Sequence, residues 1–336
     1  MIGRYVFHRL RRALLPDFQR AWTRDLNASL KDVRATLAEV QAELAELRRF
    51  RRAAVLRDWE QSRASLLDTL ETRLDVEAIA AHATRAIAGA SICNHPAPHV
   101  VVDRILPPEF HELLSAAIPP AGLFPDRDPV KQDFEMSVLG TAPELSRRVW
   151  QFFDEAIVGR VLAPALLEKL HAQVIRHYAE SGGESFGIKA ATLTHRTVAG
   201  RIQLRRPGYS LAPHLDPKRV VITGLLFFPR HGDSEDFGTQ LFSVDRPFVQ
   251  TGTKTFFPGE AGLTCTLAST VPYRANMLLA FINSGGAHGA ELPADAPLLE
   301  RYAYQFYVKP VDGELKKLLR ALPPDAQAAW GEMLQA

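Results

Sequence analysis

The second half of the chain is divided into many short runs of β-type residues, and this division restricts the fold more than any other feature of the sequence. Beyond about Gly200 the runs are separated by Gly, Pro and Asp. They cover residues 201–206, 219–228, 239–244, 252–257, 267–273, 276–282 and 301–308. Strands this short and this frequent are typical of an antiparallel sandwich or jelly roll.

Helical patterns surround the predicted β region. A short strand over 100–105 is followed by predicted helices over 107–117, 143–157 and 163–179, and a helical stretch over 58–90 leads into a linker at 94–98. We therefore predict the α+β class in three parts. These are an N-terminal helical segment over 1–93, a double-stranded β-helix (jelly roll) with flanking helices over 94–310, and a helical tail over 311–336.

A heptad pattern marks the N-terminal segment. Its apolar residues alternate in steps of four and three over residues 26–47, with no proline or glycine among them. Leucine at a and mainly valine at d is not the arrangement that favours a parallel dimer, so a trimer, a tetramer or an antiparallel intramolecular pairing stays open. We expect a homo-oligomer through this seam; the alternative is one amphipathic helix lying on its own catalytic domain. The seam consists of Leu26, Leu30, Val33, Leu37, Val40, Leu44 and Leu47.

Charge and motifs narrow the class of partner. The chain has 40 Lys and Arg against 38 Asp and Glu, a formal charge of +2, so no broad basic field indicates nucleic acid. The sequence contains no Walker-type or GxGxxG motif. Nucleotide hydrolysis and dinucleotide-linked hydride transfer therefore have no support.

Cysteine use and hydropathy bear on the compartment. Cys93 and Cys265 are far apart and have no CxxC neighbour, which favours a reducing, cytoplasmic compartment. The longest apolar stretches are interrupted by charge or proline, so no transmembrane span is expected. Residues 1–22 mix arginine with apolar residues and have no cleavage site, which predicts a basic amphipathic helix that packs against protein or touches an anionic membrane surface.

The stretch PGYSLAPHLDPKR, Pro207 to Arg219, contains the triplet His214-Leu215-Asp216. In an extended segment residues i and i+2 lie on the same side, so the imidazole and the carboxylate would point together. A third ligand from another strand would complete a face of two histidines and one carboxylate. Such a face binds non-haem Fe(II) and leaves the opposite positions open.

The third ligand is expected from the C-terminal part of the predicted sandwich. His288 follows a predicted core strand, 276–282, and a glycine-containing turn that can aim it into the sandwich. Arg301 opens the next strand. A buried arginine is costly unless an anion pairs with it, and a dicarboxylate co-substrate would supply that anion through a bidentate contact. Taken singly, His288 could be a turn histidine, Arg301 an edge-strand surface residue and Asp216 a cap.

The order HLD, LLAFINSGGAHG and RYAYQFYV resembles the Fe(II)- and 2-oxoglutarate-dependent oxygenases, in particular their prolyl-4-hydroxylase-like branch. The resemblance covers about residues 100–308, with VVDRILPPEFHELL in place of the lead-in helix and FGTQLF in place of the strand after the first two ligands. It implies His214, Asp216 and His288 as iron ligands, and Arg301 as the residue that holds the distal carboxylate of 2-oxoglutarate. Gln305 matches a position from which relatives help to hold that carboxylate.

The sequence departs from the family at two positions. Relatives often place tyrosines on the strands before and after the HxD triplet, where this chain is expected to have Arg206 and Phe227. Arg206 would then line the co-substrate pocket or face an anionic substrate. Other cations near the triplet, Arg205, Lys218 and Arg219, also suggest an anionic ligand.

The resemblance implies a dioxygenase that uses Fe(II), 2-oxoglutarate and dioxygen, and that hydroxylates a small-molecule or a saccharide- or peptide-borne substrate with release of succinate and CO₂. Desaturation or ring closure would need only a different placement of the substrate. Two other classes stay open. The same ligands suit a zinc-dependent hydrolase or isomerase, which leaves Arg301 unexplained, and the sandwich could be a non-catalytic binding module on a coiled-coil scaffold.

Overall fold

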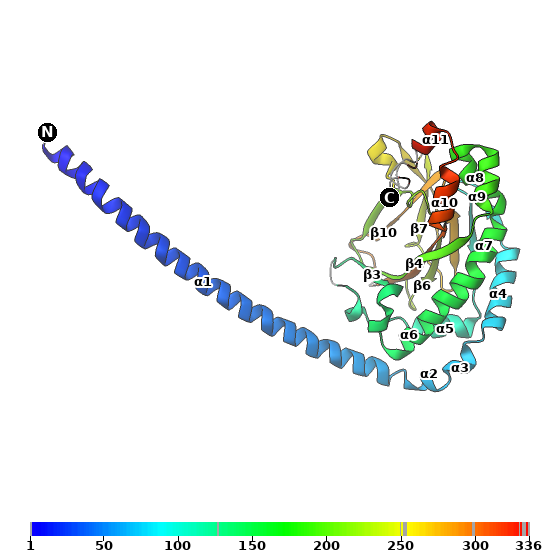
Figure 1. Cartoon of the computed structure of the whole chain (residues 1–336). Helices are drawn as coiled ribbons and strands as arrows, with labels where there is room; N and C mark the ends of the chain where they lie inside the picture. The colour runs from blue at the N-terminus through cyan, green and yellow to red at the C-terminus, as the bar shows by residue number, and fades with distance from the viewer. Residues whose placement is uncertain are drawn as a thin grey trace. The chain divides into compact units, whose positions relative to one another are not determined.

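A computed structural model describes residues 2–125, 128–248, 250, 254–297, 300–328, 330 and 334, and it divides the chain into two compact units, Met1–Asp58 and Trp59–Ala336. The first unit consists of most of helix α1 (Ile2–Gln61) (Figure 1). The seven seam side chains of α1 are 44 to 66% exposed in this single chain. The coiled coil, which needs a second helix against the seam, therefore stays a prediction. The side chains before Trp22 lie outside the described residues. None of the described helices combines the length and the apolar character that a membrane span requires.

The second unit is built on two antiparallel sheets. The larger has the order β1-β2-β9-β6-β11-β4-β3 and the smaller the order β5-β10-β7-β8; neither closes into a barrel. This arrangement is consistent with the predicted jelly roll and the α+β class. The strands of the larger sheet are β1 (Ile92–Cys93), β2 (His99–Val102), β3 (Lys131–Glu135), β4 (His195–Arg205), β6 (Ile222–Phe228), β9 (Leu278–Ile282) and β11 (Arg301–Pro310). Those of the smaller sheet are β5 (Ser210–His214), β7 (Thr239–Val244), β8 (Cys265–Val271) and β10 (Gly286–Glu291).

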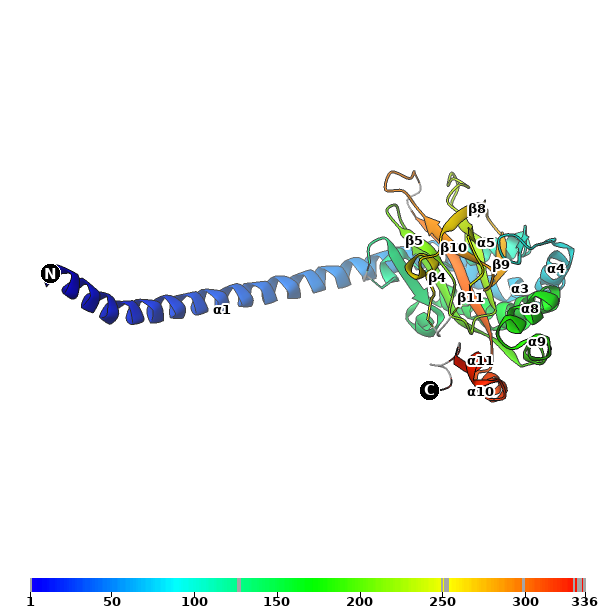
Figure 2. The ribbon, with the colours of Figure 1, turned by 90° about the horizontal axis from the view of Figure 1, so that it is seen from above.

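Helices cover the outer face of the seven-stranded sheet (Figures 1 and 2). Trp150 stacks on Tyr304 with ring centroids 5.5 Å apart, and Phe153 meets the same ring edge-on at 5.1 Å, so aromatic packing joins this layer to β11. The layer contains α4 (Val76–Gly89), α5 (Pro108–Ala116), α6 (Glu144–Phe152), the π-helix η3 (Phe153–Leu162), α7 (Ala163–Lys169), α8 (His171–Gly182) and α9 (Glu184–Ala191). Shorter elements are α2 (Ala64–Asp68), α3 (Leu70–Arg73), η1 (Ala121–Leu123), η2 (Met136–Thr141), η4 (Pro258–Ala261), α10 (Asp312–Leu319) and α11 (Pro324–Ala328).

An apolar core fills one part of the space between the sheets. Strand β6, ITGLLFF, is buried along its whole length, as a central strand covered on both faces should be. The residues of this core come from both sheets and from the loops that join them. They are Tyr209, Leu225, Phe227, Leu241, Val271, Tyr273, Met277, Leu279, Phe281, Leu292 and Ala303.

Several predicted elements differ from the observed ones. The run 239–244 coincides with β7, but the run 252–257 contains no described strand; Phe256 makes only an isolated bridge to Leu215. Strands β3 and β10 were not predicted, and the turn expected before His288 is shorter because β10 begins at Gly286. The predicted helix over 163–179 is two helices, α7 and α8. The tail breaks between α10 and α11, where Pro323 and Pro324 remove backbone donors.

Candidate metal centre

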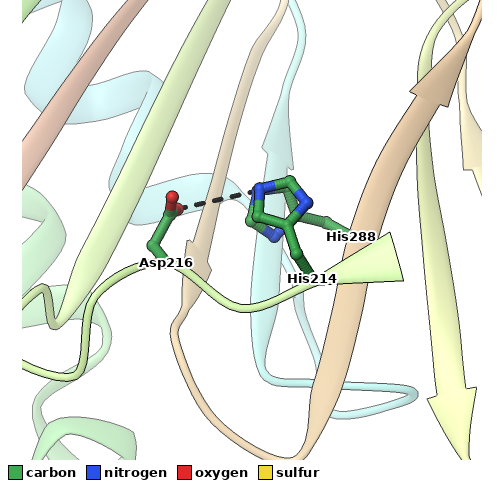
Figure 3. A group of neighbouring side chains, drawn as sticks. All are labelled: His214, Asp216 and His288. Atoms are coloured by element: carbon green, nitrogen blue, oxygen red, sulfur yellow. Dashed lines mark ion pairs between the residues drawn. The ribbon is translucent and has the colours of Figure 1, made fainter. Parts of the chain in front are cut away.

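The three residues predicted as metal ligands meet between the two sheets. His214 is the last residue of β5 and lies opposite His288 in the pairing of β5 with β10. Leu215 exchanges two backbone hydrogen bonds with Phe256, which keeps the chain extended between His214 and Asp216. Ligand atoms of the three side chains therefore lie within 4.8 Å of one another, with the carboxylate of Asp216 directed at the imidazoles (Figure 3).

Both imidazoles are in the state that a metal ion requires. Nδ1 of His214 lies 3.0 Å from the carbonyl oxygen of Ala212, to which it donates, so Nε2 is the bare nitrogen. Burial lowers the pKa of His214. Burial, followed by the nearness of His214, lowers the pKa of His288 to about 3. Both rings are therefore neutral at physiological pH and can coordinate.

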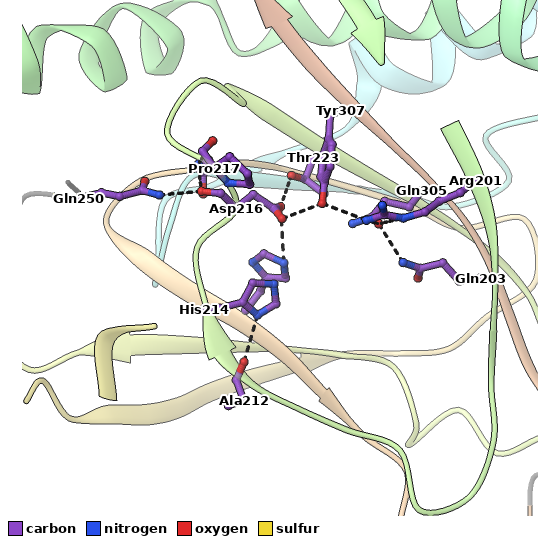
Figure 4. Close-up of polar contacts among 12 residues, drawn as sticks. Arg201, Gln203, Ala212, His214, Asp216, Pro217, Thr223, Gln250, Gln305 and Tyr307 are labelled. Atoms are coloured by element: carbon purple, nitrogen blue, oxygen red, sulfur yellow. Dashed lines mark hydrogen bonds and ion pairs between the residues drawn. The ribbon is translucent and has the colours of Figure 1, made fainter. Parts of the chain in front are cut away.

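Two hydroxyl groups orient the carboxylate. Oγ1 of Thr223 donates to Oδ2 of Asp216 at 2.6 Å, and the phenol of Tyr307 donates to Oδ1 at 2.8 Å (Figure 4). The backbone carbonyl of Asp216 accepts from the amides of Gln250 and Asn283 at 2.7 and 2.8 Å. The position of this residue is thus fixed through its side chain and its main chain, as expected for a metal-binding carboxylate.

The donor set fits a divalent transition metal. Two neutral imidazole nitrogens and one carboxylate oxygen, all buried and close together, match the preferences of Fe(II) and also those of Zn²⁺. Oδ2 of Asp216 lies 3.6 Å from Nε2 of His288, a separation that one ion can bridge. The residues fit a metal ion, and the choice between iron and zinc depends on the rest of the cavity.

Arg301 lines the same cavity, which has a volume of about 300 Å³. Its side chain is only 3% exposed, and its Nε donates to the carbonyl oxygen of Phe237 at 2.7 Å. The guanidinium carbon lies 5.3 and 5.1 Å from the ring centroids of Phe227 and Tyr273. Among the described residues no carboxylate lies within 4 Å of it. Arg301 is therefore a buried cation whose acidic partner is missing from the described part of the chain.

Of the two further residues predicted for the co-substrate pocket, Gln305 lies in the cavity and Arg206 lies outside it. Gln305 lines the cavity, and its Oε1 accepts hydrogen bonds at 2.8 Å from both Arg201 and Gln203. Arg206 lies outside the residues that line the cavity: its guanidinium donates to Gln132 at 2.9 Å and forms an ion pair with Glu300 at 3.1 Å. The expectation that Arg206 contributes to the co-substrate pocket is corrected, because β4 ends at Arg205 and Glu300 draws the next side chain away.

Sequence reasoning missed three residues of the site, Tyr209, Arg201 and Tyr307. Tyr209 lines the cavity, although counting alternate residues back from His214 does not reach it. The reason is an irregularity in the pairing of β5 with β10, where His288 faces His214 but Ala290 faces Leu211, so β5 holds one extra residue. Tyr307 could have been found, because it follows Arg301 at an even spacing on one strand.

No protein-family model and no curated protein match this sequence. Solved structures do match. A prolyl 4-hydroxylase from Pseudomonas putida is 16% identical, with 69% of this chain and 98% of that chain covered and a TM-score of 0.35. HygX from Streptomyces hygroscopicus, with nickel, 2-oxoglutarate and hygromycin B bound, is 13% identical over 63% of this chain and 83% of that chain, with a TM-score of 0.37.

A third match is an epimerase in complex with a metal ion and α-ketoglutarate. This protein, SnoN in complex with Fe³⁺, α-ketoglutarate and nogalamycin RO, is 16% identical over 70% of this chain and 83% of that chain, with a TM-score of 0.36. The first of the three proteins is a prolyl 4-hydroxylase, and the other two hold a metal ion and 2-oxoglutarate.

Proposed function

We propose that this protein is an Fe(II)- and 2-oxoglutarate-dependent oxygenase that hydroxylates a C–H bond of its substrate. One observation carries the proposal: a buried face of two histidines and one carboxylate shares its cavity with a buried arginine that has no acidic partner among the described residues. A buried group of two histidines and one carboxylate, or a buried arginine, can each occur alone for structural reasons. Together they match what a metal ion and an anionic co-substrate need at adjacent positions.

His214, Asp216 and His288 would hold the iron. Because all three ligands come from one side, the opposite coordination positions stay open for co-substrate and dioxygen. When bound there, Fe(II) with 2-oxoglutarate supplies an oxidant made from dioxygen, with succinate and CO₂ as co-products. The task of the protein is to fix the ligands, bind the co-substrate in one orientation and keep water away.

Arg301 would bind the distal carboxylate of 2-oxoglutarate. A buried guanidinium without an anion is costly, and a bidentate carboxylate removes that cost while fixing the direction of the ligand. The rings of Phe227 and Tyr273 hold the guanidinium by cation–π contacts. The hydrogen bond from its Nε to the carbonyl oxygen of Phe237 fixes its orientation. The remaining N–H groups are thereby left for a ligand. Gln305, on the same face of β11, would contribute a further polar contact.

Anaerobic binding of Fe(II) and 2-oxoglutarate tests the proposal. We expect Arg301→Ala to lose at least about 30-fold in 2-oxoglutarate affinity, because truncating one partner of a buried charge pair costs about 2–5 kcal/mol. Its iron affinity should be retained. Arg206→Ala is the matched control, since this arginine is paired with Glu300 outside the cavity. Unchanged co-substrate affinity in Arg301→Ala would remove the arginine from its role.

Turnover separates the rival classes. The oxygenase requires iron-dependent release of succinate from 2-oxoglutarate with consumption of oxygen. Hydrolysis supported by Zn²⁺ without oxygen consumption would establish the hydrolase alternative. A binding module would show neither activity and would keep its cellular role in a His214→Ala variant.

A further inference from the structure

We propose that the substrate of this site carries an anionic group, a carboxylate or a phosphate, and that Arg201 binds it. The inference rests on the proposed function and adds the substrate class. It assigns a role to a residue outside both the metal face and the co-substrate contact of Arg301.

Arg201 lies beside the metal face. It is on β4, its side chain lines the cavity, and it is opposite Gln305 in the pairing of β4 with β11. Its Nη2 lies 3.1 Å from the hydroxyl of Tyr307, which in turn donates to Asp216 at 2.8 Å (Figure 4). The guanidinium is therefore two hydrogen bonds from a predicted iron ligand, close to where a reacting C–H group must lie.

The contacts of Arg201 are with neutral groups. Nε and Nη2 both donate to Oε1 of Gln305, and the ring of Tyr307 lies 5.4 Å from the guanidinium carbon. In the described part of the chain no acidic side chain lies within 4 Å, and Nη1 has no hydrogen-bond acceptor. Glu135 is opposite Arg201 in the pairing of β3 with β4, but it is exposed and accepts from Ser137 at 3.1 Å. Arg201 thus presents a charged edge to the cavity.

The cations that the sequence suggested for an anionic ligand are accounted for otherwise. Arg205 forms an ion pair with Asp133 at 2.8 Å, and Arg206 one with Glu300. Lys218 donates to the carbonyl oxygen of Gln250 at 3.0 Å and lies over the ring of Trp330. Arg219 is exposed and is not among the residues that line the cavity.

The charges of the loaded cavity leave a positive excess. A ferrous ion, the Asp216 carboxylate, a dicarboxylate co-substrate and Arg301 together sum to zero, and Arg205 cancels Asp133. Arg201 and Lys131 remain, and both line the cavity. Lys131 is exposed at the start of β3. An anionic substrate gains from both cations, whereas a cationic one is repelled by them.

Phosphorus NMR on the loaded protein tests this inference with methyl phosphate as the probe. Cobalt(II) replaces iron so that no turnover occurs, and the paramagnetic ion broadens the resonance of a phosphate bound near it. With 2-oxoglutarate present, we expect saturable broadening in the wild type. Affinity should fall about 10- to 100-fold in Arg201→Gln, because a hydrogen bond to a charged group contributes about 1.5–3 kcal/mol. Arg206→Gln should match the wild type.

The other outcomes overturn the inference in distinguishable ways. Broadening that persists in Arg201→Gln means that phosphate contacts the metal or Lys131 instead. Loss of 2-oxoglutarate binding in Arg201→Gln, measured by calorimetry before phosphate is added, makes Arg201 a co-substrate residue. Absence of saturable broadening in a wild type that binds 2-oxoglutarate rejects the substrate class alone. Failure of the wild type to bind cobalt or 2-oxoglutarate rejects the proposed function itself. Thermal unfolding of Arg201→Gln checks that the variant is folded.

Discussion

Tyr307 donates its phenolic proton to Oδ1 of Asp216 at 2.8 Å, and this bond joins the strand that begins with Arg301 to the metal face. Burial, together with the neighbouring carboxylate, raises the pKa of Tyr307, so the phenol stays a donor across the physiological range. The Asp216 carboxylate is held in one rotamer, because Tyr307 donates to its Oδ1 and Thr223 donates to its Oδ2.

Tyr307→Phe should weaken metal binding. Without the phenol the Asp216 carboxylate loses one of its two orienting bonds, and loss of such an outer contact typically costs about 10- to 100-fold in metal affinity. Competition with a fluorescent chelator measures the change. Tyr302→Phe, on the same strand, is the control because its hydroxyl contacts Glu300 outside the cavity. Equal metal affinities in the two variants would show that Tyr307 does not support the ligand.

Arg301→Met should be at least as stable as the wild type when no co-substrate is present, because it removes a buried, unpaired guanidinium. Addition of 2-oxoglutarate at 100 times the wild-type Kd should stabilise the metal-loaded wild type by about 2.7 kcal/mol and Arg301→Met by at most about 0.9 kcal/mol, the value for a 30-fold weaker Kd. Arg205→Met gives the contrast, because it removes the hydrogen-bond donor of the Asp133 carboxylate and of the Gln132 carbonyl oxygen. This loss should lower the free energy of unfolding by about 1–3 kcal/mol. Thermal unfolding measures all three. Destabilisation of apo Arg301→Met by as much as Arg205→Met would contradict the assignment.

Gly224→Ala should destabilise the fold. Gly224 pairs with Phe306 across β6 and β11, and a Cβ at this position would overlap the phenyl ring. Overpacking of this kind costs about 1–3 kcal/mol. Gly313→Ala is the matched control, because a Cβ there meets no atom within 4 Å and alanine favours helix α10 by up to about 1 kcal/mol. Denaturant unfolding curves of the two variants should therefore shift in opposite directions.

The parts of the site that the sequence could predict are those that local geometry fixes. His214 and Asp216 share a side because the segment between them is extended, and β7 coincides with the predicted run over 239–244. The element that carries His288 was harder to predict. Its strand contains Gly286 and Gly289, which are poor strand formers, yet a Cβ at either would press against the backbone of a neighbouring strand.

Other features depend on contacts that no local pattern contains. Arg206 is held away from the cavity by Glu300, a residue 94 positions later in the chain. Arg201 gained significance only once β4 and β11 were known to pair, because the absence of an acidic partner is a property of its neighbours in space. Irregular pairing in β5 and β4 further shifts which residues face inward, and bulges of this kind have weak sequence signals.

His111 should make the stability depend on pH. Its Nε2 lies 3.0 Å from the backbone N–H of Asn276, which requires a bare nitrogen, and 3.4 Å from the carbonyl of Phe227; the shorter contact favours the neutral ring. Burial lowers the pKa of His111 below its ordinary value of 6.5. The unfolded chain therefore takes up the proton first, and stability is lost as pH falls from about 6.5 toward the folded pKa.

The comparison of His111→Gln with the wild type isolates this contribution. Glutamine keeps an acceptor but does not titrate, so the variant should lose less stability between pH 6.5 and 5, by at most about 1.4 kcal/mol per pH unit for one proton. Urea unfolding at several pH values gives both curves. Parallel curves would assign the acid sensitivity to other buried groups, such as His177, whose pKa burial lowers to about 4.

The seam of α1 leads to a prediction about assembly. Leu37 and Leu44 occupy successive a positions and are 54 and 44% exposed within one chain, so a second copy offers them an apolar partner. Light scattering on the full chain should give a molar mass that is a multiple of 37.3 kDa, and the Leu37→Glu, Leu44→Glu double variant should return to the single-chain mass.

Ala35→Glu with Ala42→Glu places the same charges at f positions, away from the seam, and should keep the oligomer. A wild type of single-chain mass would contradict self-association, whereas loss of the oligomer in both variants would attribute it to net charge. Because leucine at a with valine at d disfavours two parallel strands, a trimer, a tetramer or an antiparallel arrangement is expected rather than a parallel dimer.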